Sequence, residues 1–210
     1  MLFNENIDNW NDWGRVFQSL ETFTPLAKEI FRRNQIDFEP LSKLTPGTNG
    51  VFRSGKYVVK IFFPQESGVD PRPDFENEGS VCQRMIQLGI PTPSLIAKGI
   101  IHDKYDFYYI ITRYFDGKEA KLWLSEASQE ELVRFVKQLK QILDKLNRPA
   151  DGAIESVDLI ERAVTNFRLK SLSPKFQREI CDRVRSLELT TFVLVHGDLT
   201  GENLLVDKDG

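Results

Sequence analysis

Cysteine and histidine are scarce in this sequence, and their scarcity argues against two kinds of stabilising site. The 210 residues include 2 cysteines, Cys82 and Cys181, and 2 histidines. The cysteines lie far apart in predicted helices, so we expect free, buried thiols rather than a disulfide framework. So few potential ligands also disfavour a closed zinc site.

Long apolar runs and an excess of one charge are also absent. No run approaches the roughly 20 residues that span a membrane, and residues 1–6 lack the basic and apolar segments of a secretion signal. The 28 Lys and Arg and the 31 Asp and Glu are interspersed and give a net charge of -3, which favours neither nucleic-acid binding nor a polybasic membrane surface. We therefore expect a cytoplasmic globular protein, and its oligomeric state stays open.

The chain does contain an ordered succession of strand and helix patterns. Residues 7–34 show helical apolar spacing around Pro25, and the period then changes to that of short strands separated by turn residues. Strands are predicted over residues 38–44, 51–53, 57–63, 94–99 and 107–113, with a helix from Asp74, the expected N-cap, to Leu88. This order predicts an antiparallel sheet with a helix inserted after its third strand.

From Asp116-Gly117 onward the chain becomes mainly helical. Ser128 and Glu131 form the pattern of a capping box ahead of an apolar stripe that ends at Leu146. Two more helices are predicted over residues 156–170 and from Ser173-Pro174 onward, and two strands over residues 191–195 and 204–206.

The most informative motif lies between these last two strands, where the chain reads Val195-His196-Gly197-Asp198-Leu199-Thr200-Gly201-Glu202-Asn203. A loop that holds a carboxylate beside a substrate hydroxyl and directs a carboxamide oxygen at Mg²⁺ needs an Asp and an Asn at about this spacing. The motif therefore points to phosphoryl transfer. For this segment alone, a surface turn without chemistry is the alternative.

This loop resembles that of the aminoglycoside phosphotransferase and choline kinase superfamily, small-molecule kinases that use ATP and Mg²⁺. Their loop has His-Gly-Asp with an Asn five residues beyond the Asp, whereas protein kinases have His-Arg-Asp, so Gly197 favours the small-molecule branch. The resemblance implies that Asp198 is catalytic, that Asn203 is a magnesium ligand and that His196 braces the loop. It also implies an α+β, two-lobed protein-kinase-like fold, with an antiparallel-sheet N-lobe and a mainly helical, incomplete C-lobe.

The turn between the first two strands resembles the glycine-rich loop that covers ATP phosphates, because glycine lets backbone N–H groups approach anionic oxygens closely. Its candidate phosphate-binding residues are Gly47, Thr48, Asn49 and Gly50. An ordinary hairpin turn is the alternative. The segment from Gly50 to Lys56 also matches the start of a Walker A motif, but Tyr57 replaces the required Ser or Thr and the context is strand-turn-strand, so a P-loop is rejected.

Lys60 lies on an otherwise apolar predicted strand, Val58-Val59-Lys60-Ile61-Phe62. A cation flanked by residues that face a core needs an anionic partner, and Glu78 in the following helix can supply it. The resemblance implies that Lys60 contacts the α- and β-phosphates of ATP and pairs with Glu78. An exposed Lys and a solvated Glu are the alternative.

The segment from Tyr109 to Gly117 resembles the hinge between the lobes, where backbone groups hydrogen-bond the adenine. By that match Thr112 is the gatekeeper, and the Arg113 carbonyl and the Phe115 amide face the adenine. An ordinary strand end is the alternative.

The family pattern continues to a strand that ends in a triplet such as Ile-Asp-Phe, whose Asp is the main magnesium ligand. This sequence ends at Gly210, so we expect a chain truncated before that Asp, with residues 204–206 lacking a returning strand and with little or no kinase activity. The expected division is an N-terminal helical segment (1–37), an N-lobe (38–111), a hinge (112–117) and a partial C-lobe (118–210).

The leading hypothesis is an ATP-dependent phosphotransferase that acts on a hydroxyl of a small molecule, with an aminoglycoside antibiotic as the first candidate. Choline, homoserine, methylthioribose and fructosamines, the acceptors of related kinases, stay open, as does the choice between ATP and GTP. A nucleotide-binding pseudokinase or an inactive fragment is the second hypothesis. A protein kinase is disfavoured by Gly197.

Overall fold

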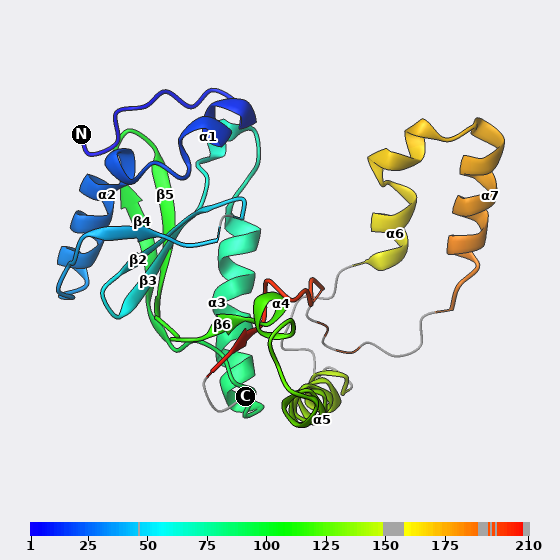
Figure 1. The fold of residues 1–210 in the computed structure, drawn as a ribbon. Coiled ribbons are helices and arrows are strands. Elements are labelled where there is room, and N and C mark those ends of the chain that lie inside the picture. Colours follow the sequence, from blue (N-terminus) through cyan, green and yellow to red (C-terminus); the bar gives the residue numbers. More distant parts are fainter. Residues whose placement is uncertain (46, 149–157, 189–192, 194, 196, 208–210) are drawn as a thin grey trace. The chain divides into compact units, whose positions relative to one another are not determined.

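The computed structural model describes residues 1–45, 47–148, 158–188, 193, 195 and 197–207 (Figure 1). The chain forms two compact units, the first made of Met1–Phe135 and Thr200–Gly210 and the second of Val136–Leu199. The helices are α1 (Trp10–Val16), α2 (Leu20–Arg33), η1 (Gln65–Ser67), α3 (Arg72–Gln87), α4 (Ala120–Trp123), α5 (Gln129–Leu146), α6 (Leu159–Val164), η2 (Phe167–Ser171) and α7 (Pro174–Arg185). The strands are β1 (Leu41–Lys43), β2 (Gly50–Ser54), β3 (Tyr57–Ile61), β4 (Leu95–His102), β5 (Asp106–Arg113), β6 (Lys118–Glu119) and β7 (Leu205–Val206).

Five strands of the first unit form one antiparallel sheet in the order β1-β2-β3-β5-β4. All five correspond to predicted strands, although β4 continues to His102 instead of ending at Gly99. Helix α3 follows β3 in sequence, as predicted, and packs against β4 and β5 (Figure 1). The predicted α+β class, with an antiparallel kinase-like sheet and a helical part, is therefore confirmed.

Alternation along β3 gives the sheet two different faces. Val59 and Ile61 are fully buried in the main core, so Lys60 between them lies on the opposite face. Lys60 pairs with Ile110 of β5, and Thr112 lies two residues further along that strand on the same side. We call the face of Val59 and Ile61 the N-terminal face and the face of Lys60, Ile110 and Thr112 the Lys60 face.

The N-terminal face is covered by the first part of the chain through a largely aromatic core. Phe3, Ile7 and Trp13 pack together with Phe23 of α2 against residues of the sheet that include Phe52. The Phe23 ring centroid lies 5.4 Å from that of Phe3 and 5.3 Å from that of Phe52. Because burial of aromatic side chains contributes a large apolar area, this core holds the N-terminal segment firmly on the sheet.

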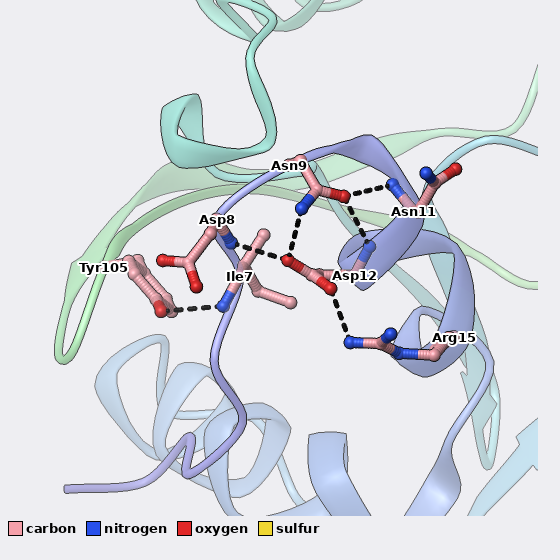
Figure 2. A network of polar contacts seen from close by, with 7 residues as sticks. All are labelled: Ile7, Asp8, Asn9, Asn11, Asp12, Arg15 and Tyr105. Atoms are coloured by element: carbon pink, nitrogen blue, oxygen red, sulfur yellow. Dashed lines mark hydrogen bonds and ion pairs between the residues drawn. The ribbon is translucent and has the colours of Figure 1, made fainter.

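The turn between β4 and β5 also holds the start of the chain, through hydrogen bonds to its backbone. The Asp103 carboxylate accepts the N–H of Leu2 at 2.9 Å and that of Phe3 at 2.7 Å. The Tyr105 hydroxyl accepts the N–H of Ile7 at 2.9 Å (Figure 2). These bonds supply acceptors to N–H groups that no helix or strand of the N-terminal segment satisfies.

Replacing Asp103 by Ala is expected to lower the free energy of unfolding by about 1–3 kcal/mol, because the N–H groups of Leu2 and Phe3 lose their acceptor. Burial alone would raise the pKa of Asp103, but the N–H donors of Phe3 and Leu2 hold it below its usual range. The stabilisation is therefore present above the unfolded-state pKa of about 3.9 and is lost as the pH falls through the lower folded-state pKa. Thermal unfolding of both proteins across this pH range measures the effect.

Asp106→Ala provides the matched control for this variant. Asp106 lies in the same turn region, but its side chain is 62% exposed and bonds to His102. We expect this control to change the free energy of unfolding by less than about 0.5 kcal/mol. Equal destabilisation by the two substitutions would show that the backbone contacts of Asp103 are unimportant.

Several helix boundaries differ from the expectation. The predicted helical stretch of residues 7–34 forms α1 and α2, because Ser19 takes an N-cap position and accepts the N–H of Thr22. Helix α3 begins at Arg72, so Asp74 lies in its first turn and is not the N-cap.

The predicted helix of residues 156–170 is the separate α6 and η2 in its described part. The capping box is confirmed, since the N–H of Ser128 donates to Glu131 at 2.7 Å and the N–H of Glu131 to the Ser128 hydroxyl at 3.3 Å. The N-cap at Ser173 is also confirmed. Within the second unit, α6 and α7 pack on each other.

Strand β7 has a partner that the sequence did not predict. It pairs antiparallel with β6, with Lys118 opposite Val206 and Glu119 opposite Leu205. This partner is not the returning strand of a hairpin, so the prediction that residues 204–206 lack a returning strand stays a prediction. A pair of two-residue strands so far apart in sequence leaves no periodic pattern from which it could be predicted. Among the described residues, no helix combines the length and apolarity needed to cross a membrane.

Candidate functional site

Lys60 and Glu78 form an ion pair on the Lys60 face, between β3 and α3. Their side chains are 27% and 35% exposed, so the pair lies at the border of the core and still meets solvent. The contact follows from packing one turn earlier on α3, where the Phe75 ring meets Phe62 edge to face with centroids 5.8 Å apart. A lysine held in this way presents a fixed positive charge that can bind a phosphate.

The Cys82 thiol lies one turn beyond Glu78 on α3. Burial and the negative charge of Glu78 raise the pKa of Cys82, while the positive charge of Lys60 acts in the opposite direction. Because the net shift is upward, the thiol is protonated at neutral pH. It is therefore an uncharged neighbour of the ion pair.

The predicted phosphate loop leads into β2 of the same sheet. Gly47 has no atom within 4 Å of where a Cβ would be, whereas a Cβ on Gly50 would come within 3.1 Å of the Phe52 ring. A larger residue at Gly50, the first residue of β2, would therefore need the Phe52 ring to shift. Asn49 is 7% exposed, and its side chain accepts the N–H of Phe63 at 3.3 Å, so it anchors the loop to the segment that follows β3.

The backbone carbonyls of this loop bond to the N-terminal segment. The indole N–H of Trp13 donates to the Thr48 carbonyl at 2.8 Å, and the Gln18 side-chain amide donates to the Asn49 carbonyl at 3.5 Å. The sequence indicated no polar role for Trp13. A donor to a backbone carbonyl leaves no motif, so the sequence carried no signal for this contact.

The predicted hinge follows directly from β5. Thr112 shares the Lys60 face, as alternation along β5 requires. The N–H of Arg113 donates to the Ser94 carbonyl at 2.9 Å. Within the described part of the chain no acceptor takes the N–H of Phe115, so this amide can donate to a ligand.

The segment that contains Asn203 docks on the chain just after the hinge. The N–H of Ala120 donates to the Leu204 carbonyl and the N–H of Lys121 to the Gly201 carbonyl, both at 2.8 Å. The Lys121 ammonium lies 2.5 Å from a Glu202 carboxylate oxygen, and this hydrogen bond lowers the pKa of Glu202. Asn203 is therefore carried on an exposed turn that is tied to β6 and α4.

Gly117 joins the hinge to this docked segment. A Cβ on Gly117 would overlap the Phe115 ring and lie 3.0 Å from the Val206 carbonyl oxygen. The sequence indicated only a turn at Asp116-Gly117. The close approach of β7 is a tertiary feature, and it explains why glycine is needed here.

Gly117→Ala is expected to lower the free energy of unfolding by about 1–3 kcal/mol, because the added methyl group pushes the Phe115 ring and the Val206 carbonyl of β7 away from residue 117. The matched control is Gly14→Ala on α1, where a Cβ meets nothing within 4 Å. Alanine in a helix is favoured over glycine, so the control is expected to be stabilised by about 0.5–1 kcal/mol. Chemical denaturation of the three proteins measures both changes, and an unchanged Gly117→Ala variant would contradict the packing argument.

The residue before the candidate catalytic Asp has an unusual backbone conformation. Gly197 has a φ of 80°, in the left-handed region, where a residue with a Cβ is destabilised by about 1–2 kcal/mol. Asp198 follows it and is exposed. Glycine in this His-Gly-Asp sequence is therefore favoured by local geometry.

The predicted burial of the strand before this motif, residues 191–195, is contradicted where it is described. Val193 and Val195 are 38% and 63% exposed. An apolar run predicts burial only if another element covers it. The rest of this strand, and His196, lie outside the described residues.

The first unit thus brings together many of the predicted site residues. The Lys60 and Glu78 pair, the loop from Gly47 to Gly50, the hinge and Asn203 all belong to it. Asp198 belongs to the second unit, so its approach to the others stays a prediction.

Comparison with known proteins identifies the family of this chain. The profile of the phosphotransferase enzyme family matches residues 47–210. The chain belongs to this family. The matched region runs from the predicted phosphate loop through the Lys60 and Glu78 pair to the Asp198 motif, which confirms the predicted superfamily, while residues 1–46 lie outside it. Neither the curated proteins nor the solved structures yielded a match.

The metal-binding side chains among the described residues do not gather in one place. Among them, no group of three or more His, Cys, Asp or Glu side chains could hold one. Magnesium in kinases is held by few protein groups together with the nucleotide phosphates, and Asn203 offers a carboxamide oxygen on an exposed turn.

Proposed function

We propose that this phosphotransferase transfers the γ-phosphate of ATP to a hydroxyl of a small molecule, with an aminoglycoside antibiotic as the first candidate acceptor. The observation that carries the proposal is the ion pair of Lys60 and Glu78 on the Lys60 face. In a chain of a phosphotransferase family, a fixed cation beside a glycine-containing turn is suited to a nucleotide triphosphate.

The proposed nucleotide site lies in the first unit. Lys60 binds the α- and β-phosphates, and Glu78 holds its ammonium group in place. Gly47 to Gly50 cover the phosphates with backbone N–H groups. Thr112 closes the inner end of the adenine site, and the Arg113 carbonyl and the Phe115 N–H bind the adenine edge.

In the proposed transfer, Asp198 accepts or orients the proton of the acceptor hydroxyl so that its oxygen can attack the γ-phosphorus. Asn203 would hold a magnesium ion through its carboxamide oxygen, and bound magnesium would neutralise phosphate charge. Most of the rate gain comes from positioning and electrostatics. Residues 38–111 then act as the nucleotide-binding lobe, residues 112–117 as the hinge and residues 118–210 as the partial C-lobe that carries the catalytic loop.

The test is a transfer assay on the purified chain with γ-labelled ATP, magnesium and a panel of hydroxyl compounds. The panel contains aminoglycosides, choline, homoserine, methylthioribose and a fructosamine, and calorimetry measures ATP binding in parallel. We expect ATP binding and magnesium-dependent labelling of one acceptor at a low rate, in keeping with the expectation of little kinase activity. Labelling of another alcohol, but of no aminoglycoside, would remove the first candidate.

Two other outcomes decide between enzyme and binding module. ATP binding without transfer to any acceptor would replace the proposal by the nucleotide-binding pseudokinase. Absence of both ATP binding and transfer would overturn it altogether.

A further inference from the structure

The N-terminal segment reaches the predicted phosphate loop from the far side of the sheet. Trp13 is 1% exposed in the core of the N-terminal face, and its ring stacks edge to face on Phe23 with centroids 5.7 Å apart. Its indole N–H donates to the Thr48 carbonyl at 2.8 Å. A buried, closely packed donor fixes the direction of that carbonyl.

The direction of the Thr48 carbonyl also sets that of the next amide. In a planar trans peptide the C=O of one residue and the N–H of the following residue point in opposite directions. With the Thr48 carbonyl turned to Trp13, the N–H of Asn49 points away from the Trp13 indole. No acceptor within the described part of the chain takes this N–H.

The position of Trp13 is itself fixed by polar contacts at the start of α1. The Asn9 side chain accepts the N–H of Asn11 at 2.9 Å and that of Asp12 at 3.2 Å (Figure 2). The Asp12 carboxylate in turn bonds to the N–H of Asp8 and to Arg15 (Figure 2). This network fixes the N-terminus of α1, one turn before Trp13. The Tyr105 hydroxyl accepts the N–H of Ile7 and so ties the residues before α1 to the sheet.

We propose that Trp13 is a positioning residue for the phosphate loop, which it holds with the Asn49 N–H directed at a phosphate of the bound nucleotide. The inference rests on the proposed function and adds a part of the chain outside the family match. It predicts that the Trp13 hydrogen bond favours ligands with phosphates and has no effect on adenosine.

The test compares ATP and adenosine binding to Trp13→Phe, which keeps an aromatic ring and removes the N–H. We expect the Kd for ATP to rise about 3- to 10-fold, the effect of one lost hydrogen bond, and the Kd for adenosine to change less than about 2-fold. Trp10→Phe is the control, because Trp10 lies on the same helix, is 41% exposed and contacts Phe63 through its ring. Its Kd values are expected to match those of the unsubstituted chain.

A second variant separates this role from folding. Gln18→Met removes the weaker donor to the Asn49 carbonyl, 3.5 Å away, without touching the core, and a smaller rise in the ATP Kd is expected. Equal changes for ATP and adenosine in the Trp13 and Gln18 variants, or no change in either, would overturn this inference alone. Failure of the unsubstituted chain to bind ATP would overturn the proposed function and this inference together.

Discussion

Asp198→Asn is expected to lower the rate of phosphoryl transfer by about 100- to 10,000-fold, the usual contribution of a general base. The substitution keeps the shape of the side chain but removes the negative charge that accepts or orients the hydroxyl proton. The Kd for ATP should change little, because the proposed contacts to the nucleotide come from other residues. Initial rates with the acceptor found in the panel, together with calorimetry, measure the two effects.

Asp182→Asn is the matched control for this loss. Asp182 is an exposed carboxylate on α7 of the same unit, and removing its charge is expected to leave the rate within about 2-fold of that of the unsubstituted enzyme. A similar rate for Asp198→Asn would show that this carboxylate does not take part in the transfer. A large rise in the ATP Kd would instead assign Asp198 to nucleotide binding.

Lys60→Met is expected to raise the Kd for ATP about 10- to 100-fold, because charge-assisted hydrogen bonds to the phosphates are lost. Adenosine, which has no phosphate, should bind with an unchanged Kd. The same calorimetric titrations give both values. Glu78→Gln should raise the ATP Kd less, since it weakens the hold on the Lys60 ammonium without removing it.

Lys98→Met separates this local effect from a general loss of positive charge. Lys98 of β4 is paired with Ile110 of β5, which on its other side pairs with Lys60, so both lysines belong to one row of the sheet. Lys98 is exposed and its Nζ lies 5.4 Å from the Phe75 ring centroid. Equal losses of ATP affinity in the two variants would contradict a specific phosphate contact at Lys60.

The features that the sequence predicted correctly depend on local patterns. Strand periodicity located the sheet, because alternating burial is a property of neighbouring residues. Lys60 stands in an otherwise apolar strand, which indicated that its charge would need an anionic partner. The following helix offered Glu78. The Ser128 and Glu131 capping box also involves residues three apart.

The features that the sequence did not reveal depend on distant contacts. The pairing of β6 with β7 joins two very short strands, so neither has a recognisable period. The bond from Trp13 to the Thr48 carbonyl and the contact of Gly117 with β7 are of the same kind. Backbone carbonyls carry no side-chain signature, and tertiary packing alone decides which donor reaches them.

In the proposed site Lys60, held by Glu78, lies beside the phosphates of bound ATP. The most direct measurement uses an ATP analogue with an acyl group on its terminal phosphate. A lysine amine beside the phosphates attacks the acyl carbon, the bond from that carbon to the phosphate oxygen breaks, ATP leaves and the lysine carries an amide. Peptide mass spectrometry then identifies the modified residue. Our account predicts modification of Lys60, suppressed by excess ATP with magnesium, and little at Lys98. Modification spread over surface lysines and unaffected by ATP, with Lys60 unmodified, would contradict it.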